Sequence, residues 1–129
     1  MKKLSLIMAA SLMLGTNAGM AAVVDDMLKE FGGAGNAQDG AAMWKKEFVD
    51  PASGEKRSCV TCHGADLKTA GKHATTGKPI EPLAPSVNKQ RLTDRQEIEK
   101  WFKRNCKWTV GRECTAQEKA NFLVFIRGQ

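Results

Sequence analysis

The N-terminal half of the chain contains two segments in which hydrophobic residues recur at helical spacing. They span residues 23–31 and 39–48, and in both the hydrophobic side chains share one helical side: Val24, Leu28 and Phe31, then Met43, Trp44 and Phe48. Two glycines end the first segment, and Asp39 can cap the start of the second. The pattern therefore predicts two short helices before residue 50.

Two further helices are predicted in the last third of the chain, and each begins with the sequence of a capping box. The boxes are Thr93-Asp94-Arg95-Gln96 and Thr115-Ala116-Gln117-Glu118. The hydrophobic sides of the two helices consist of Ile98, Trp101 and Phe102, then Phe122, Phe125 and Ile126 with Leu123 beside them. The first of these helices is predicted to end near Arg104.

The middle of the chain has no helical pattern. Residues 64–87 are rich in Gly, Pro, Thr and Lys, with a proline at 79, 82 and 85, and no segment predicts a strand. A long irregular loop inside a small domain is unusual unless it surrounds something other than protein. Aromatic residues make up only 6% of the 129 residues and Tyr is absent, so the core lacks large side chains. We expect an all-α fold of four or five short helices wrapped around a bound group.

The first 22 residues have the pattern of a cleaved secretory signal peptide. Two lysines precede an apolar run over residues 4–14, and small residues follow. The alternative is an uncleaved membrane anchor, but the run has about half the length that crosses a bilayer. We predict cleavage after Ala21 or Ala22. The mature domain, residues 23–129, would then lie in the periplasm without membrane insertion.

Composition and charge are those of an ordinary globular protein, with 42% hydrophobic and 26% charged residues. The net charge is +6, and loss of Lys2 and Lys3 with the signal peptide lowers it to +4. The basic residues are interspersed with acidic ones and form no block, so nucleic-acid binding is not expected. A mildly basic, solvated face can guide an acidic partner.

Residues 59–63 read Cys-Val-Thr-Cys-His, the sequence that attaches a c-type haem. Two thiols on one turn can reach the two vinyl groups of a protoporphyrin and form thioethers. The next residue, His63, is then placed to coordinate the iron as its proximal ligand. We therefore predict one covalent haem c on Cys59 and Cys62, which also supplies the missing core material.

Three other uses of this cysteine pair are weaker. A thioredoxin-like redox pair requires a βαβ context, which the pattern lacks. A zinc site with Cys59, Cys62, His63 and a later cysteine places two ligands on adjacent residues, which suits a tetrahedral ion poorly. A plain disulfide between Cys59 and Cys62 leaves His63 unexplained.

The sixth ligand of the iron is harder to predict. Class I cytochromes c take it from a methionine after the motif, but all six methionines precede His63. The candidates that remain are His73 in a flexible loop, several lysines, three asparagines at 88, 105 and 121, no protein ligand at all, and Met27 or Met43 by an unusual path. Asn105 shares the hydrophobic side of its predicted helix, although asparagine is also common at a helix C-terminus. Spacing alone leaves His73 and Asn105 open.

Cys106 and Cys114 remain once the haem has taken the other two cysteines. In an oxidising compartment we expect them to form a disulfide. Closing so short a loop contributes about 2.5 kcal/mol to stability in the chain-entropy model. Because Cys106 directly follows Asn105, the constraint would act on the backbone of that residue.

Several segments resemble the SHP-type monohaem cytochromes c. They are residues 99–106, which read Glu-Lys-Trp-Phe-Lys-Arg-Asn-Cys, residues 111–115, which read Gly-Arg-Glu-Cys-Thr, and the shorter segments 71–73 and 79–82. The likeness covers most of residues 40–129. It implies a modified class I cytochrome c fold that binds oxygen in the periplasm, with a dihaem or multihaem cytochrome c as electron donor.

For this chain the resemblance implies His63 as the proximal ligand, Asn105 as the sixth ligand and a disulfide between Cys106 and Cys114. A neutral amide is a hard, weak donor that suits ferric iron better than ferrous iron, so reduction should release it. The expected function is electron transfer together with binding of O2, CO or NO in the ferrous state. A bis-histidine electron carrier and a small haem oxygen or peroxide reductase are the alternatives, so enzymatic activity is left open.

Overall fold

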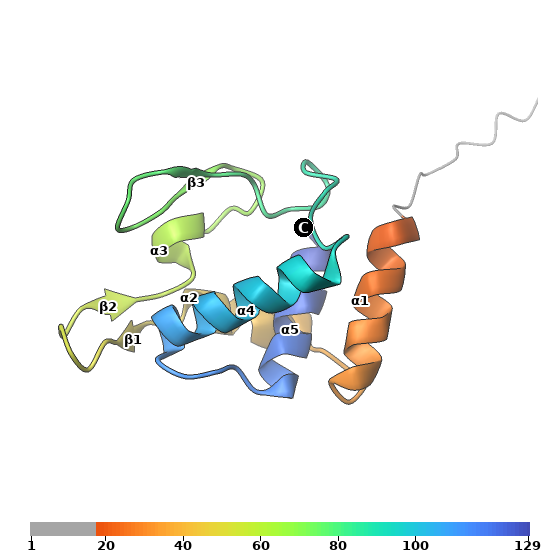
Figure 1. The fold of residues 1–129 in the computed structure, drawn as a ribbon, viewed down its shortest axis with the longest axis horizontal. Coiled ribbons are helices and arrows are strands. Elements are labelled where there is room, and N and C mark those ends of the chain that lie inside the picture. The colour runs from red at the N-terminus through yellow and green to blue at the C-terminus, as the bar shows by residue number, and fades with distance from the viewer. Residues whose placement is uncertain (1–17) are drawn as a thin grey trace, which may run out of the picture.

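The structure, a computed structural model, describes residues 18–129. Most of the predicted signal peptide therefore lies outside the described residues. The described part contains five helices: α1 (Ala18–Glu30), α2 (Ala37–Lys45), α3 (Val60–His63), α4 (Arg95–Val110) and α5 (Ala116–Arg127). In Figure 1, α4 crosses in front of α2 and α5, α1 stands at one end, and α3 lies along one side. The helix-rich class expected from the sequence is confirmed.

Three helix starts differ from the prediction. The capping box expected at Thr93 is absent, because Asp94 caps α4 and its side chain accepts hydrogen bonds from the backbone N–H groups of Gln96 and Glu97 at 2.8 and 3.2 Å. The first helix begins at Ala18, so the predicted signal-peptide boundary falls within α1. The second is capped by Asn36, whose side chain accepts hydrogen bonds from the backbone N–H groups of Gln38 and Asp39 at 2.8 and 3.2 Å. Asp39 is therefore not the cap but a first-turn residue, where its carboxylate interacts favourably with the positive end of the helix dipole.

Two helix ends also differ. The second helix stops at Lys45, so Phe48 lies outside it. The helix that was predicted to end near Arg104 continues to Val110 and stops at Gly111, which has a left-handed φ of 81°. Asn105 therefore lies inside a helix. The alternative that it ends the helix, which the sequence had left open, is wrong. The capping box at Thr115 and Glu118 is confirmed at the start of α5.

Four strands of two residues interrupt the long loops, although the sequence pattern predicted none. β1 (Phe48–Val49) pairs with β2 (Lys56–Arg57), and β3 (Gly71–Lys72) pairs with β4 (Pro79–Ile80), both antiparallel. The registers place Phe48 opposite Arg57 and Gly71 opposite Ile80. Strands of two residues are too short to show the alternation by which strands are recognised.

The core consists of two hydrophobic clusters that meet at α5. One joins α1 to α4 and α5 through buried Val24, Met27 and Leu123. The other surrounds Trp44 and Phe122, and Phe102 packs against both clusters. The helices α2 and α5 cross so closely that a Cβ on Gly40 would lie 2.3 Å from the carbonyl oxygen of Asn121. Within residues 18–129, no helix has the length and hydrophobicity to cross a membrane.

Candidate functional site

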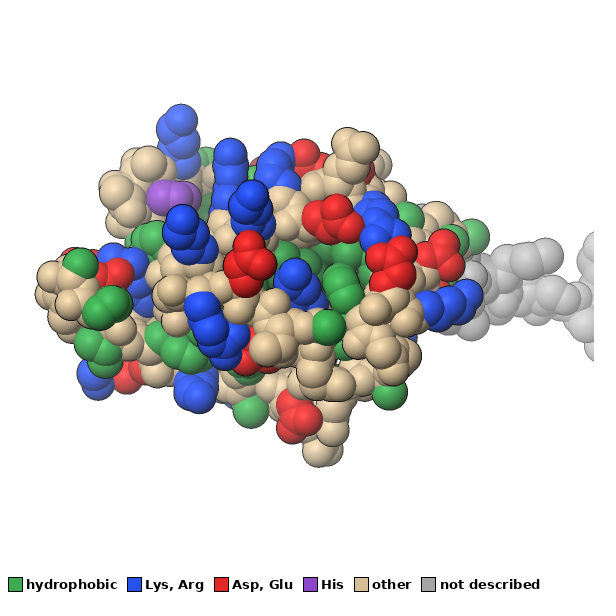
Figure 2. All heavy atoms as spheres, turned by 60° about the horizontal axis from the view of Figure 1, so that its bottom comes forward, with side chains coloured by type: hydrophobic (Ala, Val, Ile, Leu, Met, Phe, Trp, Pro, Cys, Tyr) green, Lys and Arg blue, Asp and Glu red, His purple; other side chains and the backbone are tan. Residues whose placement is uncertain are grey.

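A large cavity, here called the central cavity, lies between the attachment motif and α4. Its volume is about 1580 Å³, larger than the roughly 300–1,000 Å³ of ordinary small-molecule clefts. Its walls come from α3, α4, α5 and the irregular segment between β4 and α4. Figure 2 shows a hollow with a hydrophobic floor, surrounded by Lys and Arg side chains interspersed with Asp and Glu. The cavity is the space that the low aromatic content of the sequence predicted, although composition could not give its position.

One helical turn places both cysteines of the motif on the cavity wall. The backbone N–H of His63 donates to the carbonyl of Cys59 at 3.1 Å, which closes the turn. The Thr61 side chain accepts a hydrogen bond from the backbone N–H of Ser58 at 3.0 Å and fixes its start. Because Cys59 and Cys62 are three residues apart on this turn, they lie on the same side, and both line the cavity.

β3 passes directly over the attachment turn. A Cβ on Gly71 would lie 2.2 Å from the carbonyl oxygen of Cys62, so only glycine permits this approach. The backbone N–H of Ala74 lies 3.4 Å from the Cys62 sulfur. The loop that sequence reasoning read as an irregular wrap therefore encloses the motif from outside.

The state of the cysteines argues against a redox pair, a zinc site and a Cys59–Cys62 disulfide. Cys59 and Cys62 are not joined to one another. Burial raises the pKa of the Cys59 thiol to about 12, whereas redox-active pairs contain a cysteine whose pKa is lowered. The two later cysteines are bonded to each other, and no cluster of three or more His, Cys, Asp or Glu side chains in the described residues is arranged for a metal ion.

His63 is buried against an aromatic side chain. Its ring lies 5.6 Å from the Trp44 ring between centroids, and the Trp44 Nε1–H donates to the carbonyl of Gly64 at 3.0 Å. Burial, with the charge of Arg91 as a second cause, lowers the pKa of His63 to about 4. The imidazole is therefore neutral, which is the form that ligates a metal.

The three asparagines downstream of the motif differ in what their amides contact. Asn121 is buried outside the cavity, and its Oδ1 accepts from Asn36 N at 2.8 Å and Gln117 Nε2 at 2.9 Å. Asn88 lines the cavity, but Nδ2 donates to the Pro82 carbonyl and Oδ1 accepts from Gln90 N, both at 3.2 Å. Asn105 also lines the cavity, and no described residue hydrogen-bonds to its amide.

The other candidate ligands are placed less well. His73 lines the cavity, but its Nδ1 accepts hydrogen bonds from the backbone N–H groups of Thr75 and Thr76, both at 3.2 Å. In a neutral imidazole this places the proton on Nε2, which then has no free lone pair for a metal. Lys107 is the only described lysine that lines the cavity, and neither Met27 nor Met43 does.

The C-terminal part of α4 is held by a disulfide between Cys106 and Cys114, whose Cα atoms are 5.6 Å apart. The structure therefore contains the disulfide expected from the sequence. It connects the residue after Asn105 to the loop that precedes α5. Both cysteines are buried and line the cavity.

Arg57 is a cavity residue that sequence reasoning missed. Its Nη1 forms an ion pair with Asp50 Oδ2 at 2.7 Å and donates to the carbonyl of Trp108 at 3.2 Å. Its Nε is the only buried side-chain N or O atom in residues 18–129 without a hydrogen-bond partner. No sequence signal identifies this residue, because Trp108 is 51 positions away.

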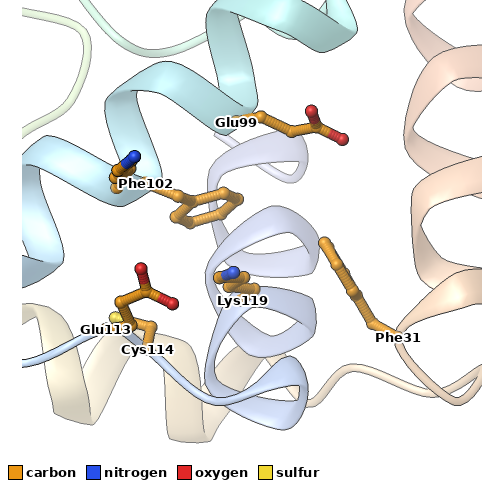
Figure 3. A pocket seen from close by; sticks show the side chains of 7 residues that line it. Phe31, Glu99, Phe102, Glu113, Cys114 and Lys119 are labelled. Carbon is orange, nitrogen blue, oxygen red and sulfur yellow. The ribbon is translucent and has the colours of Figure 1, made fainter.

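A second, smaller pocket of about 240 Å³ lies between α1, α4 and α5. The rings of Phe31 and Phe102 approach it from opposite sides (Figure 3). Glu99, Glu113, Lys103 and Lys119 surround it, and Phe102 and Cys114 line both this pocket and the central cavity. It contains none of the predicted site residues except Cys114, so the central cavity is the candidate functional site.

The residues around the central cavity fit a haem. The cavity is large and mainly hydrophobic, two free thiols lie on one turn of its wall, and the neutral imidazole follows them directly. A buried Arg Nε without a partner and a free carboxamide supply polar groups on the same walls.

Comparison with known proteins agrees with this geometry. Residues 31–126 match the family model described as a domain of unknown function, DUF1924. The cytochrome c-type protein SHP of Cereibacter sphaeroides is 44% identical over 101 residues, which cover 76% of this chain and 74% of that protein. Cytochrome c'' of Methylophilus methylotrophus is 39% identical over 88 residues, which cover 68% of this chain and 60% of that protein.

The solved structures of these relatives have the same fold. Oxidized SHP, an oxygen-binding cytochrome c, aligns with a TM-score of 0.74 at 38% identity over 85% of this chain and 96% of that chain. Oxidized cytochrome c'' aligns with a TM-score of 0.75 at 30% identity over 88% and 97%. The solution structure of cytochrome c'', which gives insights into the structural basis of haem-ligand detachment, aligns with a TM-score of 0.68 at 30% identity. The alignment covers 88% of this chain and 93% of that chain.

Proposed function

The chain belongs to the family of cytochromes c that includes SHP and cytochrome c'', and on this premise we propose that it is a periplasmic electron-transfer protein that binds small diatomic ligands. Its cofactor is one covalently bound haem c. When bound, this group would supply an iron that can hold or pass on one electron.

Cys59 and Cys62 would hold the haem, and His63 would ligate its iron from the attachment motif. The helical turn of α3 fixes the two sulfurs on one side and places the imidazole directly after them. Trp44 contacts that imidazole, and its hydrogen bond to Gly64 fastens the end of the turn. The close passage of β3 over Cys62 keeps the turn in place from outside.

Asn105 would be the second protein ligand of the iron. The observation that carries this proposal is that Asn105 alone, among the three downstream asparagines, lines the central cavity with an amide that no described residue occupies. A neutral amide oxygen is a hard, weak ligand that suits ferric iron better than ferrous iron, so Asn105 would be held less firmly by the reduced protein. Such a weakly held side chain would leave room for O2, CO or NO.

Two relatives support this behaviour. SHP is described as an oxygen-binding cytochrome c, and the solution structure of cytochrome c'' is described as giving insight into haem-ligand detachment. The hydrogen bonds to Nδ1 of His73 count against a bis-histidine carrier, because ligation through Nε2 would break both of them.

Electrons would come from a partner protein of the dihaem or multihaem cytochrome c class. The positive net charge of the chain favours a partner with an acidic surface. Such binding weakens as salt rises.

The deciding experiment compares three variants by absorption spectroscopy in both oxidation states. Asn105→Ala should give a high-spin or water-bound ferric haem, and His73→Ala should leave the spectrum unchanged. Asn105→Met should keep the ferrous haem low-spin and block CO, because a thioether stays bound to ferrous iron. A high-spin ferric haem in His73→Ala alone would replace this proposal with a bis-histidine electron carrier.

A further inference from the structure

We propose that Arg57 is a positioning residue that ties the haem-attachment segment to the helix carrying Asn105 and so limits how readily the distal ligand leaves. The part about ligand release rests on the proposed function of Asn105. The mechanical link itself is independent of it, because it consists of contacts between β2 and α4.

The first side of the link is the attachment segment. Arg57 ends β2 and is followed by Ser58 and Cys59, so only one residue separates it from the first haem-bearing cysteine. Its guanidinium is fixed by Asp50, at the other end of the same hairpin, through an ion pair of 2.7 Å. Both side chains of the pair are largely buried, at 17% and 20% exposure. A shielded pair of this kind keeps its geometry better than a surface pair.

The second side of the link is the last turn of α4. Arg57 donates to the carbonyl of Trp108 at 3.2 Å, and its guanidinium lies 4.6 Å from the centre of the Trp108 ring. The last four carbonyls of a helix have no partner within the helix, and a cation there also favours the helix dipole. Trp108 is three residues after Asn105, so it lies one turn away on neighbouring positions of the helix surface.

The same guanidinium also faces the site. Arg57 lines the central cavity, and its Nε has no hydrogen-bond partner in the described residues. Arg57 therefore contacts the attachment segment, the distal helix and the cavity at once. The disulfide of Cys106 holds α4 to the loop before α5, whereas Arg57 holds it to the haem-bearing segment.

The test uses the holoprotein and the variants Arg57→Met and Arg57→Lys. The control is Lys56→Met, which removes the same charge from the neighbouring residue, an exposed partner of Glu47 at 3.1 Å. Backbone hydrogen exchange over residues 104–110 reports the link, and the rate at which imidazole displaces the distal ligand of the ferric protein reports its effect.

Arg57→Met should speed both exchange and displacement by about tenfold, the factor expected when a hydrogen bond from a charged group is lost. Arg57→Lys keeps the charge but not the planar fork, so it should recover part of the difference, and Lys56→Met should match the wild type. If Arg57→Met does not fold, Trp108→Leu removes the ring contact from the other side and should speed exchange over the same residues.

Equal exchange in Arg57→Met and Lys56→Met would overturn the link. Faster exchange with unchanged imidazole displacement would overturn only its control of the ligand. An unchanged ferric spectrum in Asn105→Ala would instead refute the proposed function, and the exchange measurement would still decide the role of Arg57.

Discussion

Individual residues determine which polar groups face the central cavity. The amide of Asn88 is occupied by two backbone hydrogen bonds, and the Nδ1 of His73 by two more. Both side chains are therefore already engaged in hydrogen bonds to nearby backbone groups of their own loops. Asn105 is different because it lies inside α4. The backbone groups around it bond to one another along the helix, so its side-chain amide has no backbone partner and faces the cavity.

At the residue scale, sequence reasoning identified the chemistry but not the contacts. Cys59, Cys62 and His63 form a local motif of fixed spacing, so the sequence could propose them directly. Spacing left His73 and Asn105 open and only the family resemblance favoured Asn105; the structure adds which of the two side chains has hydrogen-bond partners, which spacing cannot show. Arg57 was missed because its partners, Asp50 and Trp108, are brought to it only by the fold.

Gly71 provides a test of the tight packing over the attachment turn. Gly71→Ala should destabilise the holoprotein by about 1–3 kcal/mol, because its Cβ would overlap the carbonyl of Cys62. Denaturant unfolding measures the change. Gly128→Ala is the control, since its Cβ would meet no atom closer than 3.6 Å. Equal stability of the two variants would mean that β3 moves aside at no cost.

Among the secondary-structure elements, the local capping rule predicted one helix start correctly and placed another one residue too early. The capping box at Thr115 and Glu118 is present, whereas α4 is capped by Asp94 and not by Thr93. The start of α2 was misplaced because Asn36 and Asp39 are both capping residue types three positions apart. The end of α4 was misplaced because Asn105 fits a helix end, whereas the first residue that stops the helix is Gly111.

The capping box of α5 should make stability depend on pH. The hydrogen bond from Arg112, with one from Thr115 as a further cause, lowers the pKa of Glu118 from 4.5 to about 2. Its stabilising effect is therefore complete above about pH 4.5 and is lost as the pH falls toward 2.

Glu118→Gln should lower the free energy of unfolding by about 1 kcal/mol at pH 7, and the difference from the wild type should vanish near pH 2. Thermal unfolding between these pH values measures it. Glu113→Gln serves as a control on a neighbouring exposed carboxylate. A difference that persists unchanged at pH 2 would contradict an effect of the ionised carboxylate.

The disulfide of α4 should affect ligand release more than haem attachment. Reduction, or replacement of Cys106 and Cys114 by Ser, should lower stability by about 2.5 kcal/mol and speed displacement of the distal ligand by imidazole. The covalent haem should remain, because the two cysteines proposed to hold it, Cys59 and Cys62, are not part of this pair. Identical displacement rates before and after confirmed reduction would show that the bridge serves stability alone.

At the scale of the whole molecule, the cavity divides the protein core. The two hydrophobic clusters share Phe102 and neighbouring positions of α5, and the remaining space between α3 and α4 is the central cavity. The low aromatic content of the sequence predicted such a deficit, although not its position.

A chain that cannot attach haem should therefore lose cooperative folding. Cys59→Ala with Cys62→Ala should broaden or abolish the thermal transition and reduce helix content, because so large a cavity loses the contacts of its lining. Circular dichroism measures both effects, and the disulfide-deficient holoprotein is the control. A sharp transition at the holoprotein temperature would mean that the protein clusters suffice.

The position of α1 has a consequence for maturation of the chain. As described, its first turn contains no acidic residue. If cleavage follows Ala22, Asp25 and Asp26 become first-turn residues of a shortened helix. Their negative charges then attract the new α-amino group and interact favourably with the positive end of the helix dipole. Asp25 also pairs with Arg127 at 2.7 Å, and the buried Val24, Met27 and Leu28 are all retained. Processing would thus leave a helix with a better electrostatic start than its precursor. The buried core residues of α1 would be kept, and only the partly buried Met20 would be lost from its packing surface.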